Sequence, residues 1–336
     1  MEMIGKSDSD SDGVDDLEGT VVSEISQRQR TAPLREPGGA FTPPLGPALR
    51  AAPRSHPMGS GAQRGVAHDP GSQRPPESPD VRGGTRTDRT PPTPRAWAEA
   101  CTGTLLSQPC RAVYIFAKRN GIPFELRPVE LRKGQHHSDA FAQVNPLKKV
   151  PALKDGDFTL AESVAILLYL SRKYEVPDHW YPQDLQARAR VDEYLAWQHT
   201  TLRSSCTRAM WQKMMSPVFL GEQVPAETLV STLAELDRCL QLLEDKFLKD
   251  QDFLAGPHIS VADLVAITEL MHPVSAGCQI FKSRPKLAAW RQRVEAEVGK
   301  DLFQEAHAVV LKAKDLPPAD TSIKEKLKPS VQVLLR

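Results

Sequence analysis

Hydrophobic and polar positions change their spacing along this chain, and the changes mark out its elements. After about residue 105, the apolar residues Val113, Phe116 and Ala117 recur at helical spacing. Asn120-Gly121 is a typical stop for such a helix. The sequence therefore predicts an amphipathic helix that opens close to the segment Ser107-Gln108-Pro109-Cys110.

Strand and hairpin patterns follow this helix. Residues 124–131 begin with the alternation typical of a strand. Residues 136–144 favour a short helix with Ser138 as its cap, because a serine hydroxyl can accept from a free amide of the first turn. Two short apolar runs flank Asp155-Gly156-Asp157, which is typical of a hairpin, and an apolar helix is expected over 162–174. This order of elements predicts a small mixed α/β unit.

The patterns after a linker at 175–183 are all helical. Residues 184–215 predict one long helix, and Ser260-x-x-Asp263 predicts a capping box, in which each side chain binds the other residue's backbone amide. Ile259 and Leu264 stand at the positions of a hydrophobic staple around that box. Further helices are expected at 226–248, 258–273, 284–299, 301–315 and, as a short terminal element, near 330–336.

The first hundred residues differ in composition from the rest. They begin with SDSDSDGVDD and continue as a mixture rich in Pro, Gly, Arg, Ser and Thr. Such a segment buries too little apolar surface to offset the entropy of ordering its backbone, about 1–2 kcal/mol per residue. We therefore expect a disordered extension over 1–100, a mixed α/β domain over 101–176 and an all-helical domain over 184–336. The fold class is α+β.

Charge and cysteine content exclude several classes of protein. The 43 basic side chains nearly balance the 42 acidic ones, whereas nucleic-acid and membrane-surface proteins are strongly basic. The N-terminus lacks the apolar core of a secretory signal, and no run of 18 apolar residues is present. The five scattered cysteines form no C-x-x-C pair, so a reduced cytoplasmic protein without a metal site is expected.

Three short motifs carry candidate chemistry, and each also has an ordinary structural interpretation. Ser107 can cap a helix or donate a hydrogen bond to sulfur, while Cys110 is either a small buried hydrophobe or a redox thiol. Glu162-Ser163 can start a helix or bind an anion there. The pattern alone favours a trans Val150-Pro151 bond; a cis bond would turn the Val150 backbone outward, toward an extended peptide.

The order and spacing of these motifs are more specific than any one of them. SQPCRAVYIFAKRNGIPFE, then NPLKKVPALKDGDFTLAESVAILLYL, then GPHISVADL together resemble the glutathione transferases, most closely the theta class, over residues 105–336. The resemblance implies a thioredoxin-like glutathione-binding domain followed by an all-α domain. It also implies a homodimer in the cytoplasm, with the nucleus as a further location, and glutathione as co-substrate with no other cofactor.

The same resemblance implies roles for individual residues. Ser107 would be the catalytic serine that stabilises the glutathione thiolate, and Arg203 would lie near the thiol. Pro151 would follow a cis bond, and Ser260 and Asp263 would stabilise the fold. The remaining glutathione contacts would be His136 at the glycyl carboxylate, Lys149 beside the cis bond, the Val150 backbone at the cysteinyl part, and Glu162 and Ser163 at the γ-glutamyl end.

The expected reaction is attack of the glutathione thiolate on a small hydrophobic electrophile, such as a haloalkane or an epoxide, with peroxidase activity toward organic hydroperoxides as an addition. The C-terminal helix would cover the electrophile pocket, although Ser330 departs from the aromatic or basic residue expected there. Two alternatives stay open. One is a non-catalytic dimerisation or interaction module with this fold, and the other is a thiol oxidoreductase that uses Cys110.

The residues before Leu105 depart from the family pattern. A thioredoxin-like domain begins with an inner strand, yet PRAWAEACTGTLL contains a helix-like stretch and a glycine, which weakens a strand. We therefore expect the N-terminal extension to replace that strand. Residues 100–106 would form at most a stub, and the sheet would be short.

Overall fold

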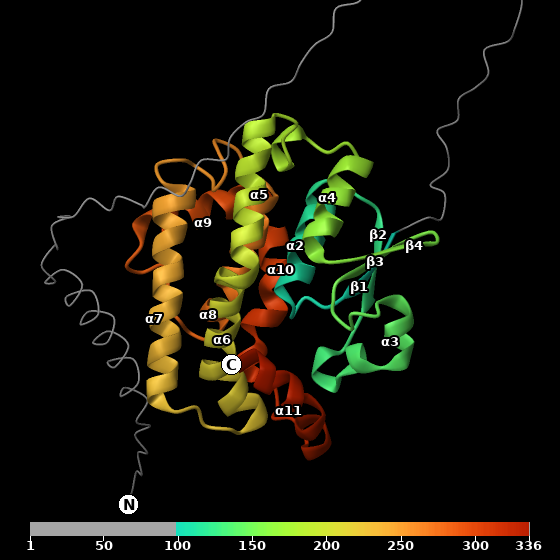
Figure 1. Cartoon of the computed structure of the whole chain (residues 1–336), viewed down its shortest axis with the longest axis vertical. Helices are drawn as coiled ribbons and strands as arrows, with labels where there is room; N and C mark the ends of the chain where they lie inside the picture. Colours follow the sequence, from blue (N-terminus) through green and yellow to red (C-terminus); the bar gives the residue numbers. More distant parts are fainter. Residues whose placement is uncertain (1–98, 336) are drawn as a thin grey trace, which may run out of the picture. The chain divides into compact units, whose positions relative to one another are not determined.

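A computed structural model of the protein describes residues 99–335 (Figure 1). The prediction of a disordered segment over 1–100 therefore falls almost wholly outside the described residues. Within them, a mixed four-stranded sheet with flanking helices precedes a long series of helices. The predicted α+β class is confirmed.

The sheet has the order β2-β1-β3-β4. Strand β1 (Glu99–Gly103) pairs in parallel with β2 (Phe124–Pro128) and antiparallel with β3 (Ala152–Asp155). The hairpin predicted around Gly156 is confirmed, because β3 continues through that turn into its antiparallel partner β4 (Phe158–Ala161).

The expectation that the first strand is missing is wrong. β1 has five residues and lies inside the sheet, with Cys101 opposite Leu126 on one side and Leu153 on the other. The neighbouring strands supply backbone partners on both edges, and this pairing outweighs the weak strand propensity of EACTG. Ala100 and Cys101 are both buried. A strand covered on both faces does not need the alternation that the sequence lacks.

Helical segments accompany the sheet. They are α2 (Gln108–Arg119), the 3₁₀ turns η1 (Leu131–Lys133) and η2 (Gln135–His137), α3 (Asp139–Val144) and α4 (Ser163–Lys173). Ser138 caps α3 as predicted, since its hydroxyl accepts from the Phe141 amide at 3.2 Å. Phe116 on α2 is fully buried against the edge of the Trp180 ring. This packing fixes the direction in which α2 starts.

The predicted long helix over 184–215 is interrupted. Helix α5 (Leu185–Thr200) ends at Thr201, whose ψ of −78° departs from helical geometry, and α6 (Leu202–Met210) begins anew. The Ser205 hydroxyl donates to the Thr201 carbonyl, a contact that bends helices. A π-helical segment η4 (Trp211–Leu220) follows and contains Pro217, which has no amide to donate.

One helix of this part, α8 (Val261–Ser275), is almost wholly buried and packs against α2, α5, α6 and two later helices, α9 (Pro285–Val298) and α10 (Lys300–Leu311). The remaining elements are η3 (Asp178–Trp180), α7 (Ala226–Leu242), the π-helical η5 (Leu243–Leu248), η6 (Ala313–Asp315) and α11 (Thr321–Leu335). The terminal helix is thus much longer than the short element expected near 330–336. Among the described residues, no helix combines the length and the apolar surface needed to cross a membrane.

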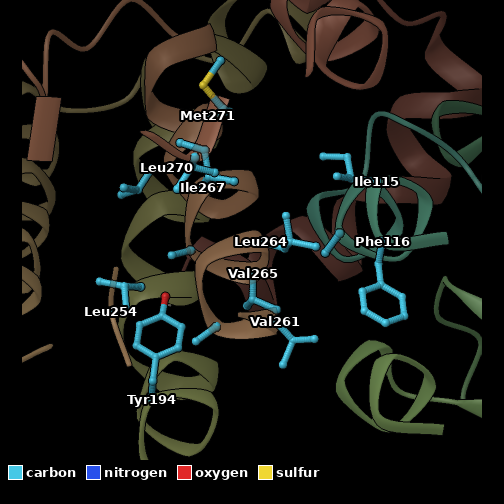
Figure 2. Packing of buried hydrophobic residues seen from close by; sticks show 14 of the residues in the cluster. Ile115, Phe116, Tyr194, Leu254, Val261, Leu264, Val265, Ile267, Leu270 and Met271 are labelled. Carbon is cyan, nitrogen blue, oxygen red and sulfur yellow. The ribbon is translucent and has the colours of Figure 1, made fainter. Parts of the chain in front are cut away.

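Side chains of α8 form the centre of the hydrophobic core (Figure 2). Leu264 points toward Ile115 and Phe116 of α2, and Tyr194 and Leu254 pack on α8 from another direction. The helix that carries the serine segment is therefore packed directly on the central helix of the all-helical part.

The predicted capping box starts α8. The Asp263 carboxylate accepts from the backbone amide and the hydroxyl of Ser260, at 2.9 and 3.0 Å. It also accepts from the Leu254 amide at 2.9 Å and the Trp290 indole at 2.8 Å. Ile259 and Leu264, the expected staple pair, are both buried. A carboxylate this well supplied with donors serves as a structural anchor.

Candidate active site

Ser107 occupies the N-cap position of α2 with an extended backbone, and it is only 9% exposed. The Ser107 carbonyl accepts from the Arg111 amide at 3.1 Å. The Ser107 hydroxyl makes no capping bond and instead pairs with the Cys110 thiol. The prediction that the hydroxyl caps the helix is therefore wrong. Pro109 contributes to this, since it stands in the first turn and removes one of the two amides that an N-cap hydroxyl usually binds.

Cys110 is buried over β1, with its sulfur against Gly103. The amide of Thr104 also contacts this sulfur, and burial raises the pKa of the thiol above its ordinary value despite these contacts. The sulfur therefore stays protonated at neutral pH, and its S–H can point at the Ser107 oxygen. This favours the interpretation of Cys110 as a packing residue, since redox thiols have a lowered pKa and solvent access.

A cavity of about 530 Å³ adjoins the start of α2. The Val150-Pro151 peptide bond in its wall is cis, as the resemblance implied and the pattern alone did not. Asn145 holds this turn, because its amide group donates to the Lys149 carbonyl at 2.7 Å. The cavity brings together most of the residues predicted to bind glutathione, namely Lys149, Val150, Glu162, Ser163 and Arg203, with Pro151 beside them.

Glu162 has an unusual backbone at the edge of this cavity. Its φ of +67° lies in a region that non-glycine residues rarely adopt, and it immediately precedes α4. The Glu162 side chain does not cap α4. It therefore leaves the first amides of this helix, which lie at the edge of the cavity, without a side-chain acceptor. Such a terminus favours a carboxylate.

Arg203 is held from behind by a buried carboxylate. Its Nε lies 2.7 Å from Glu269 Oε1, and the Glu269 side chain is 1% exposed. Burial raises the pKa of Glu269 above its ordinary value. Contacts with Arg203 and Gln108 and the charge of Arg111 lower it, but they do not cancel the effect of burial. No local pattern indicated this pair, because Glu269 lies on α8, 66 residues after Arg203.

A second cavity of about 260 Å³ lies on the other side of the serine segment. Ser107 and His136 line it, and most of its wall is apolar: Leu106, Leu131, Met210, Trp211, Met215, Phe219, Leu327 and Val331. The last two belong to α11, so the C-terminal helix forms one side. Gln108 lines both cavities, and its Nε2 donates to Thr207 Oγ1 at 2.9 Å between them.

His136 is thus separated from the other predicted glutathione contacts, since it lines the second cavity and they line the first. Its ring packs on His137 with 3.9 Å between centroids. Burial, His137 and Lys326 together lower the pKa of His136 to about 4. At neutral pH the ring is uncharged and offers one N–H donor.

Comparison with known proteins shows where this arrangement recurs. The N-terminal domain of glutathione S-transferases matches residues 103–172, and the C-terminal domain of the same family matches 207–297. Glutathione S-transferase theta-3 of Mus musculus is 82% identical over 69% of this chain and 96% of its own length. The chain belongs to the glutathione S-transferase family. Glutathione S-transferase theta-1 of Homo sapiens is 79% identical over 69% of this chain and 97% of its own length. These two relatives place the chain in the theta class.

Solved glutathione transferases share the fold. Human glutathione-S-transferase T1-1 in its apo form superimposes with a TM-score of 0.70, at 76% identity over 71% of this chain and all of its own. Human glutathione transferase theta-2, solved in complex with glutathione and an unknown ligand, gives 0.67 at 49% identity, over 70% of this chain and all of its own. The thioredoxin-like sheet followed by a helical part is the fold of this family, and this chain is a glutathione transferase.

Proposed function

We propose that this chain uses Ser107 to stabilise the thiolate of bound glutathione and conjugates it to small, largely apolar electrophiles. The observation that carries the proposal is the position of the serine segment between two cavities. Ser107 lines the apolar cavity, and the next residue, Gln108, lines both. A thiol bound at this junction would lie beside the hydroxyl and close to the electrophile.

Glutathione is a peptide with two carboxylates, and the first cavity offers matching groups. We infer that the α4 start, with Glu162 and Ser163, holds the γ-glutamyl end, which carries both an ammonium and a carboxylate. The Val150 backbone would pair with the cysteinyl part as an added strand. Lys149 and Arg203 supply positive charge in the same cavity. The His136 N–H would meet the glycyl carboxylate where the two cavities approach each other.

The chemical problem is the pKa of the glutathione thiol, which is about 8.5 without a protein. The start of α2 and a hydroxyl donor both favour the thiolate. Because the Cys110 thiol stays protonated and can donate to the Ser107 oxygen, the serine proton is free to point at glutathione sulfur.

The thiolate then attacks carbon. With a haloalkane, the C–S bond forms as the C–halogen bond breaks, and halide leaves with the electron pair. With an epoxide, the C–O bond of the ring breaks, and the alkoxide takes a proton from water. We further propose peroxidase activity, in which the thiolate attacks a hydroperoxide oxygen, the O–O bond breaks and the alcohol leaves. The glutathione sulfenic acid so formed reacts with a second glutathione to give glutathione disulfide and water.

Location and assembly follow the family. We propose a homodimer that works in the cytoplasm. All five cysteines of the chain lie within the described residues, are buried and form no disulfide, which suits a reducing compartment. The non-catalytic alternative loses its main reason, because the first strand is present and paired.

The test is conjugation of glutathione to a small haloalkane, measured as halide release, together with retention on immobilised glutathione. We expect turnover by the full chain, and retained binding with kcat lowered about a hundredfold or more for Ser107→Ala. Absence of turnover by folded wild-type protein that binds glutathione would overturn the proposal. So would undiminished turnover by Ser107→Ala.

A further inference from the structure

Arg111 is completely buried, although arginine is among the side chains most rarely found inside proteins. It lies on α2 one turn after Ser107 and lines neither of the two cavities. Its guanidinium group donates from Nη2 to the Thr268 carbonyl of α8 at 2.8 Å. The serine segment is thereby tied to the central helix of the core.

The other end of the same guanidinium group holds the loop before the serine. Nη1 donates to the Leu105 carbonyl and to the Leu106 carbonyl, both at 3.0 Å. The Arg111 amide donates to the Ser107 carbonyl at 3.1 Å. One residue therefore supplies donors to three consecutive carbonyls that end at Ser107. The bond to Ser107 comes from the backbone and would survive any substitution except proline. The planar fork of arginine is what reaches the Leu105 and Leu106 carbonyls on one side and α8 on the other, whereas a lysine offers a single nitrogen.

The charge of Arg111 persists in this site. Burial lowers the pKa of Arg111 to about 10, with Glu269 opposing the shift, so the group is cationic at neutral pH. Glu269 also pairs with Arg203 of the first cavity. Arg203 is thus the ion-pair partner of Glu269, whereas Arg111 interacts with that carboxylate only through its charge and donates its own hydrogen bonds to carbonyl groups.

His272 holds the same loop from a second direction. Its Nε2 lies 3.4 Å from the Leu106 carbonyl, and burial keeps the pKa of this ring well below its ordinary value. The ring is therefore neutral, and Nε2–H is the donor. His272 and Arg111 both donate to this one carbonyl. The loop would otherwise carry carbonyl groups buried without partners.

We propose that Arg111 is a positioning residue for catalysis: it fixes the Leu105–Ser107 backbone so that the serine hydroxyl meets the glutathione thiol, and it adds positive charge that favours the thiolate. This inference rests on the proposed role of Ser107. A residue with only a packing role would be served as well by an apolar side chain, because burying a cation is costly and apolar replacements are often neutral or stabilising.

The experiment measures the pKa of bound glutathione in the full chain, from thiolate absorbance in the ultraviolet, together with the pH profile of kcat/KM. Arg111→Lys keeps a cation and removes the fork. Arg119→Lys is the matched control, since Arg119 lies on the same helix, is exposed, and donates to the Glu297 carbonyl at 2.7 Å. Ser107→Ala run in parallel tests the proposed function itself.

We expect Arg111→Lys to raise the pKa of the bound glutathione thiol by about one unit. At pH values below that pKa, this shift should lower kcat/KM about tenfold. The KM for glutathione should change little. The control should match the wild type. Loss of stability with an unchanged thiol pKa would reduce Arg111 to a structural role and overturn the inference. Should Arg111→Lys not fold, His272→Leu decides: a smaller upward shift supports the inference, and no shift overturns it. A wild type without a thiolate signal would instead refute the role of Ser107.

Discussion

The sulfur of Cys110 occupies the space that a side chain at position 103 would need. A Cβ atom built on Gly103 would lie 2.7 Å from Cys110 Sγ, closer than such atoms approach in proteins. The glycine that weakens β1 as a strand is therefore what lets α2 lie close over that strand.

Gly103→Ala should accordingly destabilise the protein. We expect the free energy of unfolding to fall by about 1–3 kcal/mol, the usual cost of overpacking, as measured by urea unfolding. The double variant Gly103→Ala with Cys110→Ala should recover most of the loss, because alanine has no Sγ. Additive losses in the double variant would contradict the close approach of these two residues as the cause.

Cys110→Ala alone separates packing from redox chemistry. We expect kcat/KM for glutathione conjugation to stay within about fivefold of wild type, because Cys110 offers Ser107 only a weak S–H hydrogen bond. Ser107→Ala should lower kcat by about a hundredfold or more, typical of losing a donor to a reacting anion. The reverse ranking of the two variants would support the thiol oxidoreductase alternative.

Asp263→Ala should be among the most damaging substitutions in the helical part. It leaves the Leu254 amide, the Ser260 amide and the Trp290 indole without their acceptor. We expect a loss of at least about 3 kcal/mol, since each buried donor left unpaired costs about 1–3 kcal/mol. Denaturant midpoints give the measurement. Asp301→Ala, at the exposed first turn of α10, is the control and should change stability little.

Stability should fall on mild acidification. Burial lowers the pKa of His307 from its ordinary 6.5 to about 3. Between these pH values His307 is protonated in the unfolded chain and neutral in the folded chain. The free energy of unfolding therefore falls as pH drops from about 6.5 toward 3. His136 and His272 act in the same direction. His307→Phe should flatten the dependence of unfolding free energy on pH below 6.5 and leave it unaltered above 7; an unchanged slope would contradict this assignment.

Much of the fold could be predicted because its signals are local. The hairpin around Gly156, the cap at Ser138 and the capping box of Ser260 and Asp263 each involve residues a few positions apart. The interruption at Thr201 was missed because Ser205 back-bonding competes with a strong helical pattern, and sequence periodicity does not register it. The domain boundaries drawn from composition stay predictions.

Of the candidate site, the sequence indicated several residues that line one cavity, and it did not indicate how they are arranged. Lys149, Val150, Glu162, Ser163 and Arg203 meet in one cavity as the resemblance implied. His136 faces the other cavity, and Gln108, Asn145 and Glu269 have no local pattern that would single them out. Gln108 and Glu269 act through partners distant in sequence, Thr207 and Arg203, whereas Asn145 bonds to the nearby Lys149 carbonyl across a turn that contains no recognisable pattern.

The sequence by itself determined the periodicity of the helices, the turns and caps, and the ordered set of motifs that resembles glutathione transferases. Only the tertiary structure decided that EACTG is an inner strand, that Cys110 packs on Gly103, and that Arg111 holds the serine loop. The reason is physical. A weak strand former becomes a strand when two neighbours offer backbone partners on both edges, and a buried arginine becomes useful when three carbonyls converge on it. Neither circumstance is written in the local pattern of the chain.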